Sequence, residues 1–120
     1  MDKLTKQEEE VMKAIWQLGR CGVKEVVELL PEPQPPYTTV ASVITKLKRK
    51  AFVTQEKEGK AYVYCPAIGE NEYKKRFMSG FVRDYFRNSF KEMVTFFAKD
   101  EKLSEQDLRE IIKEIESHNP

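Results

Sequence analysis

One segment, from Pro36 to Lys50, constrains the fold of this chain more than any other. Its apolar residues recur at the spacing of one helix face; they are Val40, Val43, Ile44 and Leu47. Pro36 disfavours continuation of any earlier helix, and Thr38 or Thr39 is expected to cap the first turn by accepting a backbone hydrogen bond. The segment therefore predicts a helix that is buried along one side.

The other side of this predicted helix is small, hydroxylated and basic. It carries Thr39, Ala41, Ser42, Thr45, Lys46 and Arg49, with Lys48 and Lys50 at its flanks. No acidic residue occurs between Gln34 and Gln55. Such a surface fits the major groove of DNA, with the early residues at base edges and the basic end on phosphates. A solvated basic face on an ordinary amphipathic helix is the alternative interpretation.

Composition limits the size and class of the protein. Its 120 residues suit one compact domain or two very small ones. Residues 36–69 carry six basic and two acidic side chains, whereas residues 1–35 carry five and seven, so positive charge is focused on the predicted helix and the segment after it. No apolar run approaches the roughly 18 residues of a membrane span, and the N-terminal segment lacks the apolar core of a signal peptide. Cys21 and Cys65 have no metal-type spacing, so we expect free thiols in a cytoplasmic protein that does not insert into membranes.

Two short helices are predicted before the central segment. Residues 4–18 form the first, with Thr5 and Glu8 as a capping box, and residues 23–30 form the second. Four prolines within residues 31–36 make the next stretch a connection, because proline excludes a regular element there. The order of elements is that of a helix-turn-helix, with a turn longer than in its tightest versions.

A hairpin is predicted after the central segment. Residues 52–57 and 60–65 are β-branched and aromatic runs on either side of Glu58-Gly59, which can serve as the turn. Three helices and then a hairpin predict a mainly α winged-helix domain, in which Lys57 and Lys60 contact phosphates or the adjacent minor groove. A hairpin that only covers the core is the alternative.

The chain changes character at residue 70. Residues 70–120 hold six of the seven phenylalanines, together with ten basic and eleven acidic side chains. They predict one helix to about Arg87 and two more opened by the capping pairs Ser89/Glu92 and Ser104/Asp107. Three short helices cannot bury so many large groups alone, so we expect a second copy of the chain to cover them through a two-fold axis. Packing of these helices onto the first domain is the alternative.

The chain is thus expected to divide at residue 70. Residues 1–69 would form the DNA-binding domain, and residues 70–120 a small three-helix dimerisation domain. A dimer would double the contacts and need two half-sites about one helical turn of DNA apart. The expected dimer interface comprises Phe77, Phe81, Tyr85, Phe90, Val94, Phe97, Leu108, Ile111, Ile112 and Ile115.

Four stretches carry a resemblance to a known family: LTKQEEEVMKAIW, YTTVASVITKLKRKAFV, GKAYVYCP and FFAKDEKLSEQDLREIIKEI. From about residue 4 to residue 115 the chain resembles the penicillinase-repressor family. The resemblance implies a homodimeric cytoplasmic repressor that covers a palindromic double-stranded DNA operator of TACA/TGTA type. It implies base contacts by Thr38, Thr39 and Ser42. The positions that it assigns to phosphates and to the wing are Tyr37, Lys46, Arg49, Lys50, Lys60 and Tyr62.

The resemblance also implies that proteolysis within the C-terminal domain relieves repression, started by a membrane-bound sensor protease. The family's Asn-Phe bond corresponds here to Thr95-Phe96, which departs from the family pattern. No cysteine occurs after Cys65, unlike the cysteine cluster of the copper-responsive branch. Ala51 stands where the family usually has glycine and is expected to call for a slightly different turn.

Patterns of catalysis and metal binding are missing from the sequence. Its single histidine, His118, has no partners with metal-ligand spacing, and without a histidine base no Ser-His or Cys-His nucleophile can be assembled. We therefore expect no enzyme, no cofactor and no metal. Two other readings stay open: a winged-helix module whose basic helix docks on an acidic protein, and a sensor that binds an effector through its aromatic residues.

Overall fold

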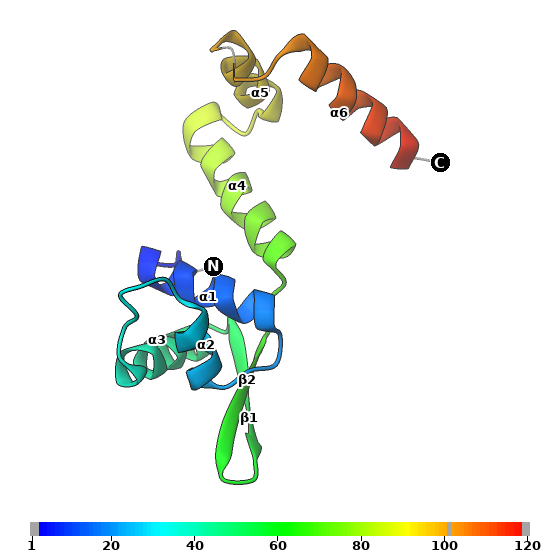
Figure 1. Ribbon diagram of the computed structural model, residues 1–120. Helices are drawn as coiled ribbons and strands as arrows, with labels where there is room; N and C mark the ends of the chain where they lie inside the picture. The colour runs from blue at the N-terminus through cyan, green and yellow to red at the C-terminus, as the bar shows by residue number, and fades with distance from the viewer. Residues whose placement is uncertain (1–2, 101, 119–120) are drawn as a thin grey trace. The chain divides into compact units, whose positions relative to one another are not determined.

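The computed structural model describes residues 3–100 and 102–118 (Figure 1). Its elements are α1 (Lys6–Leu18), α2 (Val23–Leu29), α3 (Tyr37–Arg49), β1 (Val53–Glu58), β2 (Ala61–Pro66), α4 (Glu70–Phe86), α5 (Phe90–Lys99) and α6 (Glu105–His118). This order confirms the predicted mainly α fold of three helices, a two-stranded wing and further helices. The chain packs as two units, one up to Lys75 and the other from Arg76 onward. The assignment of residues 1–69 to DNA binding and 70–120 to dimerisation stays a prediction.

The predicted capping box opens α1. Thr5 Oγ1 accepts a hydrogen bond from the Glu8 amide at 3.1 Å, and Glu8 Oε1 accepts one from the Thr5 amide at 2.8 Å. Both bonds satisfy amides that have no partner within the helix. Helix α1 consequently begins at Lys6, two residues later than the prediction.

Helix α3 begins without a hydroxyl cap, so the prediction that Thr38 or Thr39 caps it is wrong. Pro36 is the N-cap, and its carbonyl oxygen accepts hydrogen bonds from the amides of Thr39 at 3.0 Å and Val40 at 3.2 Å. Proline already has the backbone angles that a helix start requires. The two threonine hydroxyls are therefore not used to start the helix.

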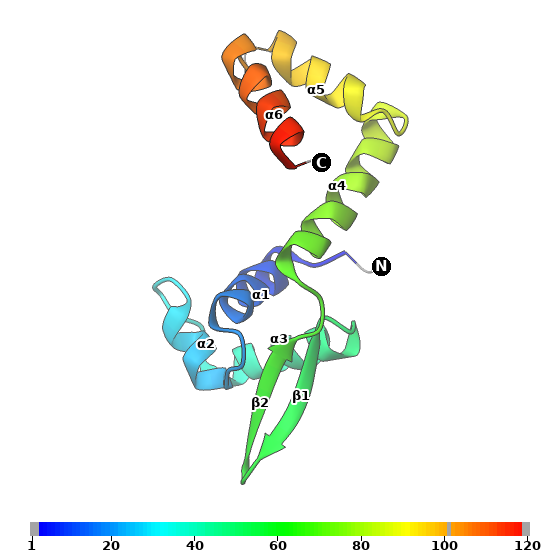
Figure 2. The ribbon, with the colours of Figure 1, turned by 90° about the vertical axis from the view of Figure 1, so that its right-hand side faces the viewer.

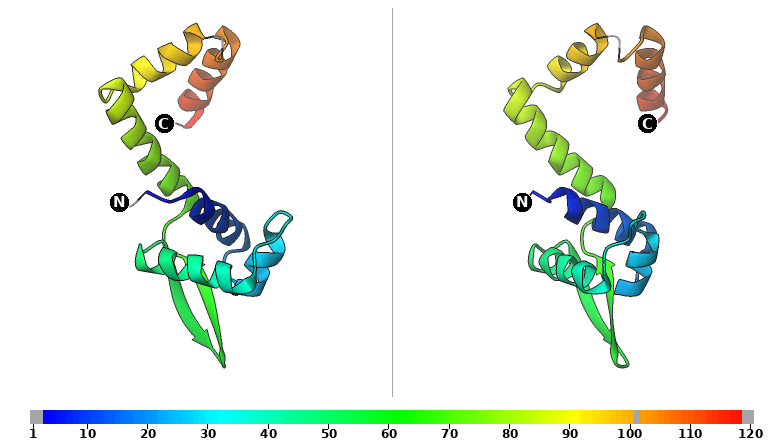
Figure 3. Two further views of the ribbon diagram at one scale, coloured as in Figure 1. Left: turned by 90° about the vertical axis from the view of Figure 1, so that its left-hand side faces the viewer. Right: turned by 60° about the vertical axis from the view of Figure 1, so that its left-hand side comes forward.

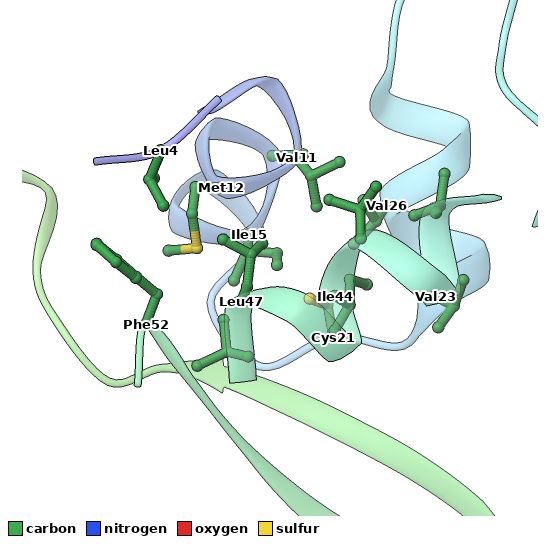
Figure 4. Packing of buried hydrophobic residues seen from close by; sticks show 14 of the residues in the cluster. Leu4, Val11, Met12, Ile15, Cys21, Val23, Val26, Ile44, Leu47 and Phe52 are labelled. Carbon is green, nitrogen blue, oxygen red and sulfur yellow. The ribbon is translucent and has the colours of Figure 1, made fainter. Parts of the chain in front are cut away.

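The apolar stripes of α1, α2 and α3 meet in one core, which Figure 4 shows at close range. Ile44 and Leu47 of α3 are fully buried there, as are Met12 and Ile15 of α1. Burying a side chain of this size stabilises the fold by about 1.5–3 kcal/mol relative to exposing it. The core therefore fixes which face of α3 points to solvent.

The end of α3 is a Schellman motif with alanine in the glycine position. The Phe52 amide donates to the Leu47 carbonyl at 2.9 Å, and the Ala51 amide donates to the Lys48 carbonyl at 3.0 Å. Ala51 has φ of 67°, in the left-handed region that favours glycine. The motif's apolar contact is provided by Leu47 and Phe52, which are both buried in the core.

Strands β1 and β2 form the wing, an antiparallel hairpin that extends beyond the three helices of its unit (Figure 2). Glu58 pairs with Ala61, so the turn residues are Gly59 and Lys60 and not the predicted Glu58 and Gly59. Gly59 has φ of 63°, which explains why the turn shifts by one residue. The base of the hairpin is held by Cys21, which exchanges hydrogen bonds of 2.9 and 2.7 Å with Tyr64.

The first turn of α4 belongs to the first unit. Tyr73 donates a hydrogen bond from its hydroxyl to Glu9 Oε2 at 2.8 Å, and its ring contacts Trp16 and Phe52 at centroid distances of 5.6 and 5.7 Å. Trp16 Nε1 donates to the Ile68 carbonyl at 2.8 Å. These contacts close one side of the core with a group of aromatic side chains.

The second unit comprises the rest of α4 with α5 and α6, which Figure 3 shows in two further views. Both predicted caps are present: Ser89 Oγ accepts from the Glu92 amide at 3.0 Å, and Ser104 exchanges hydrogen bonds of 3.0 and 3.1 Å with Asp107. Of its described residues only Val82 is fully buried. Three helices of this size leave most of their apolar side chains at the surface.

Candidate nucleic-acid interface

The exposed face of α3 carries most of the predicted DNA-binding residues. Tyr37, Thr38, Ser42, Lys46 and Arg49 are exposed, and Thr39 is half-buried. The hydroxyls of Thr38, Thr39 and Ser42 make no hydrogen bond within residues 3–100 and 102–118. Thr45 differs, because its hydroxyl donates to the Ala41 carbonyl at 3.0 Å. The structure therefore presents three hydroxyls with free donors and acceptors on one face.

The four cations at the end of α3 have different surroundings. Lys46 and Arg49 are exposed and form no ion pair with any residue that the structure describes. Lys48 Nζ donates to Gln55 Oε1 of the wing at 3.2 Å. Lys50 Nζ lies 2.8 Å from Glu8 Oε1 and is half-buried. Lys50 is thus engaged in an ion pair with a buried carboxylate, whereas Lys46 and Arg49 are available to bind an anion.

Glu8 is the one buried acidic residue of the described chain, with 3% of its surface exposed. Burial raises the pKa of its carboxyl group, but the hydrogen bonds from Lys50 and Thr5 and the charge of Lys50 outweigh burial, and the net pKa lies below its ordinary value. Glu8 is therefore a carboxylate at neutral pH, and Lys50 supplies its counter-charge.

The wing separates its charges between two faces. Lys57 pairs with Tyr62 across the strands, so these two exposed residues share one face. Glu56 and Glu58 point to the other face, where Arg20 binds them at 3.0 and 2.6 Å. Lys60 is exposed in the turn. The face with Lys57 is therefore basic, and on the other face Arg20 offsets one of the two negative charges.

Three tyrosines come together between α3 and the wing. Tyr37 is the first residue of α3, and Tyr62 and Tyr64 are alternate residues along one face of β2. Burial, and after it the proximity of Tyr37 and Tyr62, raises the pKa of Tyr64. The Tyr64 hydroxyl therefore stays protonated near neutral pH and can donate a hydrogen bond to an anion.

The residues predicted for a dimer interface lie at or near the surface of the second unit. Seven are exposed: Phe77, Tyr85, Phe90, Val94, Ile111, Ile112 and Ile115. Phe81, Phe97 and Leu108 are half-buried. Helix α5 contains no buried residue. Thr95 and Phe96, at the predicted cleavage bond, are both exposed in the middle of α5.

Sequence reasoning missed Arg20 and Gln55. Gln55 lies two residues before Lys57 on the same strand face, so strand alternation could have placed it beside the basic helix. Arg20 gives no such signal, because its partners are 36 and 38 residues away in the sequence.

The described residues also bear on metal binding and on membrane-spanning helices. They contain no group of three or more His, Cys, Asp or Glu side chains placed to hold a metal ion. None of the helices in residues 3–100 and 102–118 has the length and apolar character needed to span a membrane. The side chain of His118 lies outside the described part of the chain.

Comparison with known proteins places these features in a family. The penicillinase repressor of Bacillus licheniformis is 26% identical to this chain, and the alignment covers 97% of this chain and 91% of the relative. The methicillin resistance regulatory protein MecI of Staphylococcus aureus (strain N315) is 24% identical over 91% of this chain and 89% of its own.

One solved structure similar to part of this chain contains DNA. It is the solution structure of monomeric BlaI from Bacillus licheniformis in complex with the blaP half-operator, with 30% identity and a TM-score of 0.50 over 60% of this chain and 89% of that one. The family described as Penicillinase repressor matches residues 4–117. The chain therefore belongs to the penicillinase repressor family.

Proposed function

We propose that this protein is a transcriptional repressor that binds double-stranded DNA through the exposed face of α3 and the wing. The observation that carries the proposal is that face itself, where free hydroxyls and two unpaired cations lie opposite a fully buried stripe. The relatives named above support it, one of them solved with a half-operator. The protein acts in the cytoplasm, where chromosomal DNA is accessible to it.

The hydroxyl residues Thr38, Thr39 and Ser42 read base edges in the major groove. Hydroxyls donate or accept hydrogen bonds there, and a threonine methyl packs on the methyl group of thymine. Lys46 and Arg49 contact phosphates, which fixes the register of the helix without reading sequence. Lys50 is not included among the phosphate contacts, because its ammonium group already neutralises Glu8.

The wing and the first residue of α3 bind the flanking backbone. Lys57 and Tyr62 provide a charge and a hydroxyl on the basic face of the hairpin, and Lys60 adds a second charge in its turn. Tyr37 adds a second exposed hydroxyl at the start of α3. Contacts on both sides of the reading helix hold its axis in the groove.

Binding is tested by selecting duplexes from a random library and measuring affinity at several salt concentrations. Arg49→Gln should weaken binding to every duplex and lower the salt dependence, because a phosphate contact is lost. Thr39→Ala should mainly reduce the preference for the selected sequence. Lys13→Gln, an exposed charge on α1, serves as the control. Wild-type protein that selects no sequence while binding an acidic protein would instead favour the protein-interaction module.

The repressor acts as a homodimer through its second unit. Phe90 and Ile112 expose 51% and 55% of their surfaces, and further apolar side chains of the same unit are exposed as well. Leaving so much apolar surface in water is unfavourable, and a second copy covers it with an identical patch. Two copies would present two α3 helices to half-sites about one turn of DNA apart.

Sedimentation of two variants tests the dimer. Ile112→Glu should give monomers, because a charge cannot be buried unpaired in an apolar interface. Lys113→Glu changes the adjacent exposed residue and should leave the dimer intact. An unaltered dimer for Ile112→Glu would contradict this interface.

Repression is relieved by cleavage in the second unit, at or near Thr95-Phe96, in response to a membrane-bound sensor protease. A protease binds an extended strand, so α5 must open locally, and the absence of buried residues in α5 makes such opening inexpensive. Incubation with an inducer and a sensor protease encoded beside the repressor should generate a new terminus there. A new terminus elsewhere, or none, would count against this site.

A further inference from the structure

A basic hollow lies in the first unit between the beginning of α1 and the end of α3. Its volume is about 450 Å³. Gln7 and Glu8 line it from α1, and Lys46, Arg49 and Lys50 line it from the other side. Gln7 is exposed and is not among the residues predicted to bind DNA.

The hollow has an excess of positive charge. Its single carboxylate, Glu8, is bound by Lys50 at 2.8 Å, so these two charges cancel. Lys46 and Arg49 remain, with no ion pair to any described residue. Side chains such as Val43 form part of the wall, and apolar walls focus the field of the two cations. This charge distribution fits a phosphate group.

We propose that the hollow takes a phosphate of the DNA backbone and that Gln7 is a further DNA contact, donated by α1. The inference rests on the proposed DNA binding. Lys46 comes four residues after Ser42, so the two lie one turn apart on the same face of α3. A strand whose bases meet Ser42 runs on past Lys46 into the hollow, where the Gln7 amide donates to a phosphate oxygen.

The shape of the hollow favours a backbone over a free ion. It is open to solvent and much larger than one phosphate group, so a nucleic-acid strand with its sugars can pass through it. Lys46 and Arg49 also lie on exposed positions of α3, which carries the hydroxyls that read bases in the proposed function. The hollow is thus a continuation of the reading surface.

The central test compares Gln7→Glu with Gln17→Glu. The first substitution adds a carboxylate to the hollow and removes none of its cations, and a negative charge in the first turn of a helix does not weaken that helix. The second makes the same change of net charge at an exposed position near the other end of α1. Gln7→Glu should melt like the wild type, and Gln17→Glu, with a negative charge at the C-terminal end of α1, should melt at a slightly lower temperature.

Gln7→Glu should weaken binding to a selected duplex by about tenfold or more, the effect of losing a hydrogen bond to a charged group. The slope of log affinity against log salt should become shallower by about 0.9, the contribution of one phosphate. Gln17→Glu should bind like the wild type. Equal affinities for the two variants would overturn the proposal.

A second measurement locates the phosphate. Single phosphates of the duplex are replaced in turn by neutral methylphosphonate. Replacement at one position in each half-site should weaken DNA binding by the wild type but not by Gln7→Glu, because that variant already lacks the phosphate contact. Losses that are the same in both proteins at every position would contradict the assignment.

Two outcomes separate this inference from the proposed function. If the wild type selects no duplex, the proposed function fails. If the wild type binds and Thr39→Ala lowers its preference, while Gln7→Glu matches Gln17→Glu, only the hollow fails. If millimolar inorganic phosphate binds in the hollow of the wild type but leaves DNA affinity equal to that in a chloride control of the same ionic strength, the hollow is a site for free phosphate and the backbone contact is overturned.

Discussion

Lys50 Nζ lies 2.8 Å from Glu8 Oε1, which joins the residue that ends α3 to the capping box that opens α1. One carboxylate therefore serves two purposes: it caps its own helix and anchors the neighbouring one. The run of cations after Thr45 is not a uniform basic surface, because Lys50 is bound internally while Lys46 and Arg49 are free to bind DNA in the proposed function.

Lys50→Met should lower the free energy of unfolding by about 2–3 kcal/mol, because Glu8 then remains buried without a counter-charge. The cost is below that of a fully buried pair, since 25% of the Lys50 side chain is exposed. Lys48→Met removes the neighbouring exposed charge and should change stability by less than about 0.5 kcal/mol. Urea unfolding measures both, and equal stabilities would show that the pair is not structural.

The stability supplied by Glu8 should depend on pH. Its pKa in the folded protein is below the ordinary value of 4.5, so its contribution is complete above about pH 4.5 and is lost as the pH falls through the lowered pKa. Unfolding free energies of the wild type and Glu8→Gln should therefore differ by a constant amount near neutrality and converge in acid. If the difference in unfolding free energy between the two proteins grew in acid, the pKa of Glu8 would be raised on folding, and the pairing with Lys50 would be contradicted.

Ala51→Gly should stabilise the first unit by about 1 kcal/mol, because alanine pays a steric penalty in the left-handed conformation and glycine does not. The Schellman hydrogen bonds of Ala51 and Phe52 use the backbone alone and persist in the variant. Ala61→Gly, in the wing, should instead cost about 0.5–1 kcal/mol. The denaturant midpoints of the two variants should move in opposite directions, and a lower midpoint for Ala51→Gly would show that the turn is unstrained.

Arg20→Gln should weaken operator binding by roughly threefold to tenfold at low salt, with the loss shrinking as salt screens the charges. The substitution leaves Glu56 and Glu58 without the guanidinium that binds them. Stability should change little, because all three groups are exposed. Adding Glu58→Gln should restore part of the affinity. A loss that persists unchanged at high salt would point to a misfolded wing instead.

Helix periodicity and capping patterns were sufficient to predict most of the first unit. The stripe from Val40 to Leu47 identified α3, and the Thr5/Glu8 pattern identified the capping box of α1, although the helix begins two residues later than predicted. Both signals are local, so they do not depend on how the chain folds back on itself. The N-cap of α3 was predicted wrongly because Pro36 and two threonines occur within four positions. The sequence alone does not show which of them precedes the first helical residue.

The features that sequence reasoning did not find depend on distant contacts. Lys50 meets Glu8 across 42 positions, and Arg20 meets the wing across 36. No local pattern distinguishes Lys50 from Lys46, although Lys50 pairs with buried Glu8 and Lys46 is exposed. The hollow beside Gln7 likewise exists only once α1 and α3 are packed together.

The most direct test of DNA reading by α3 is a residue-by-residue map of the protein surface on binding. Labelled protein is titrated with a selected duplex, and amide chemical shifts are recorded by NMR. The largest changes should fall on residues 37–49 and on the wing around Lys57 to Tyr62, with little change at Lys13 or Gln17 on the outer side of α1. Strong binding that leaves residues 37–49 unchanged would contradict DNA reading by this helix.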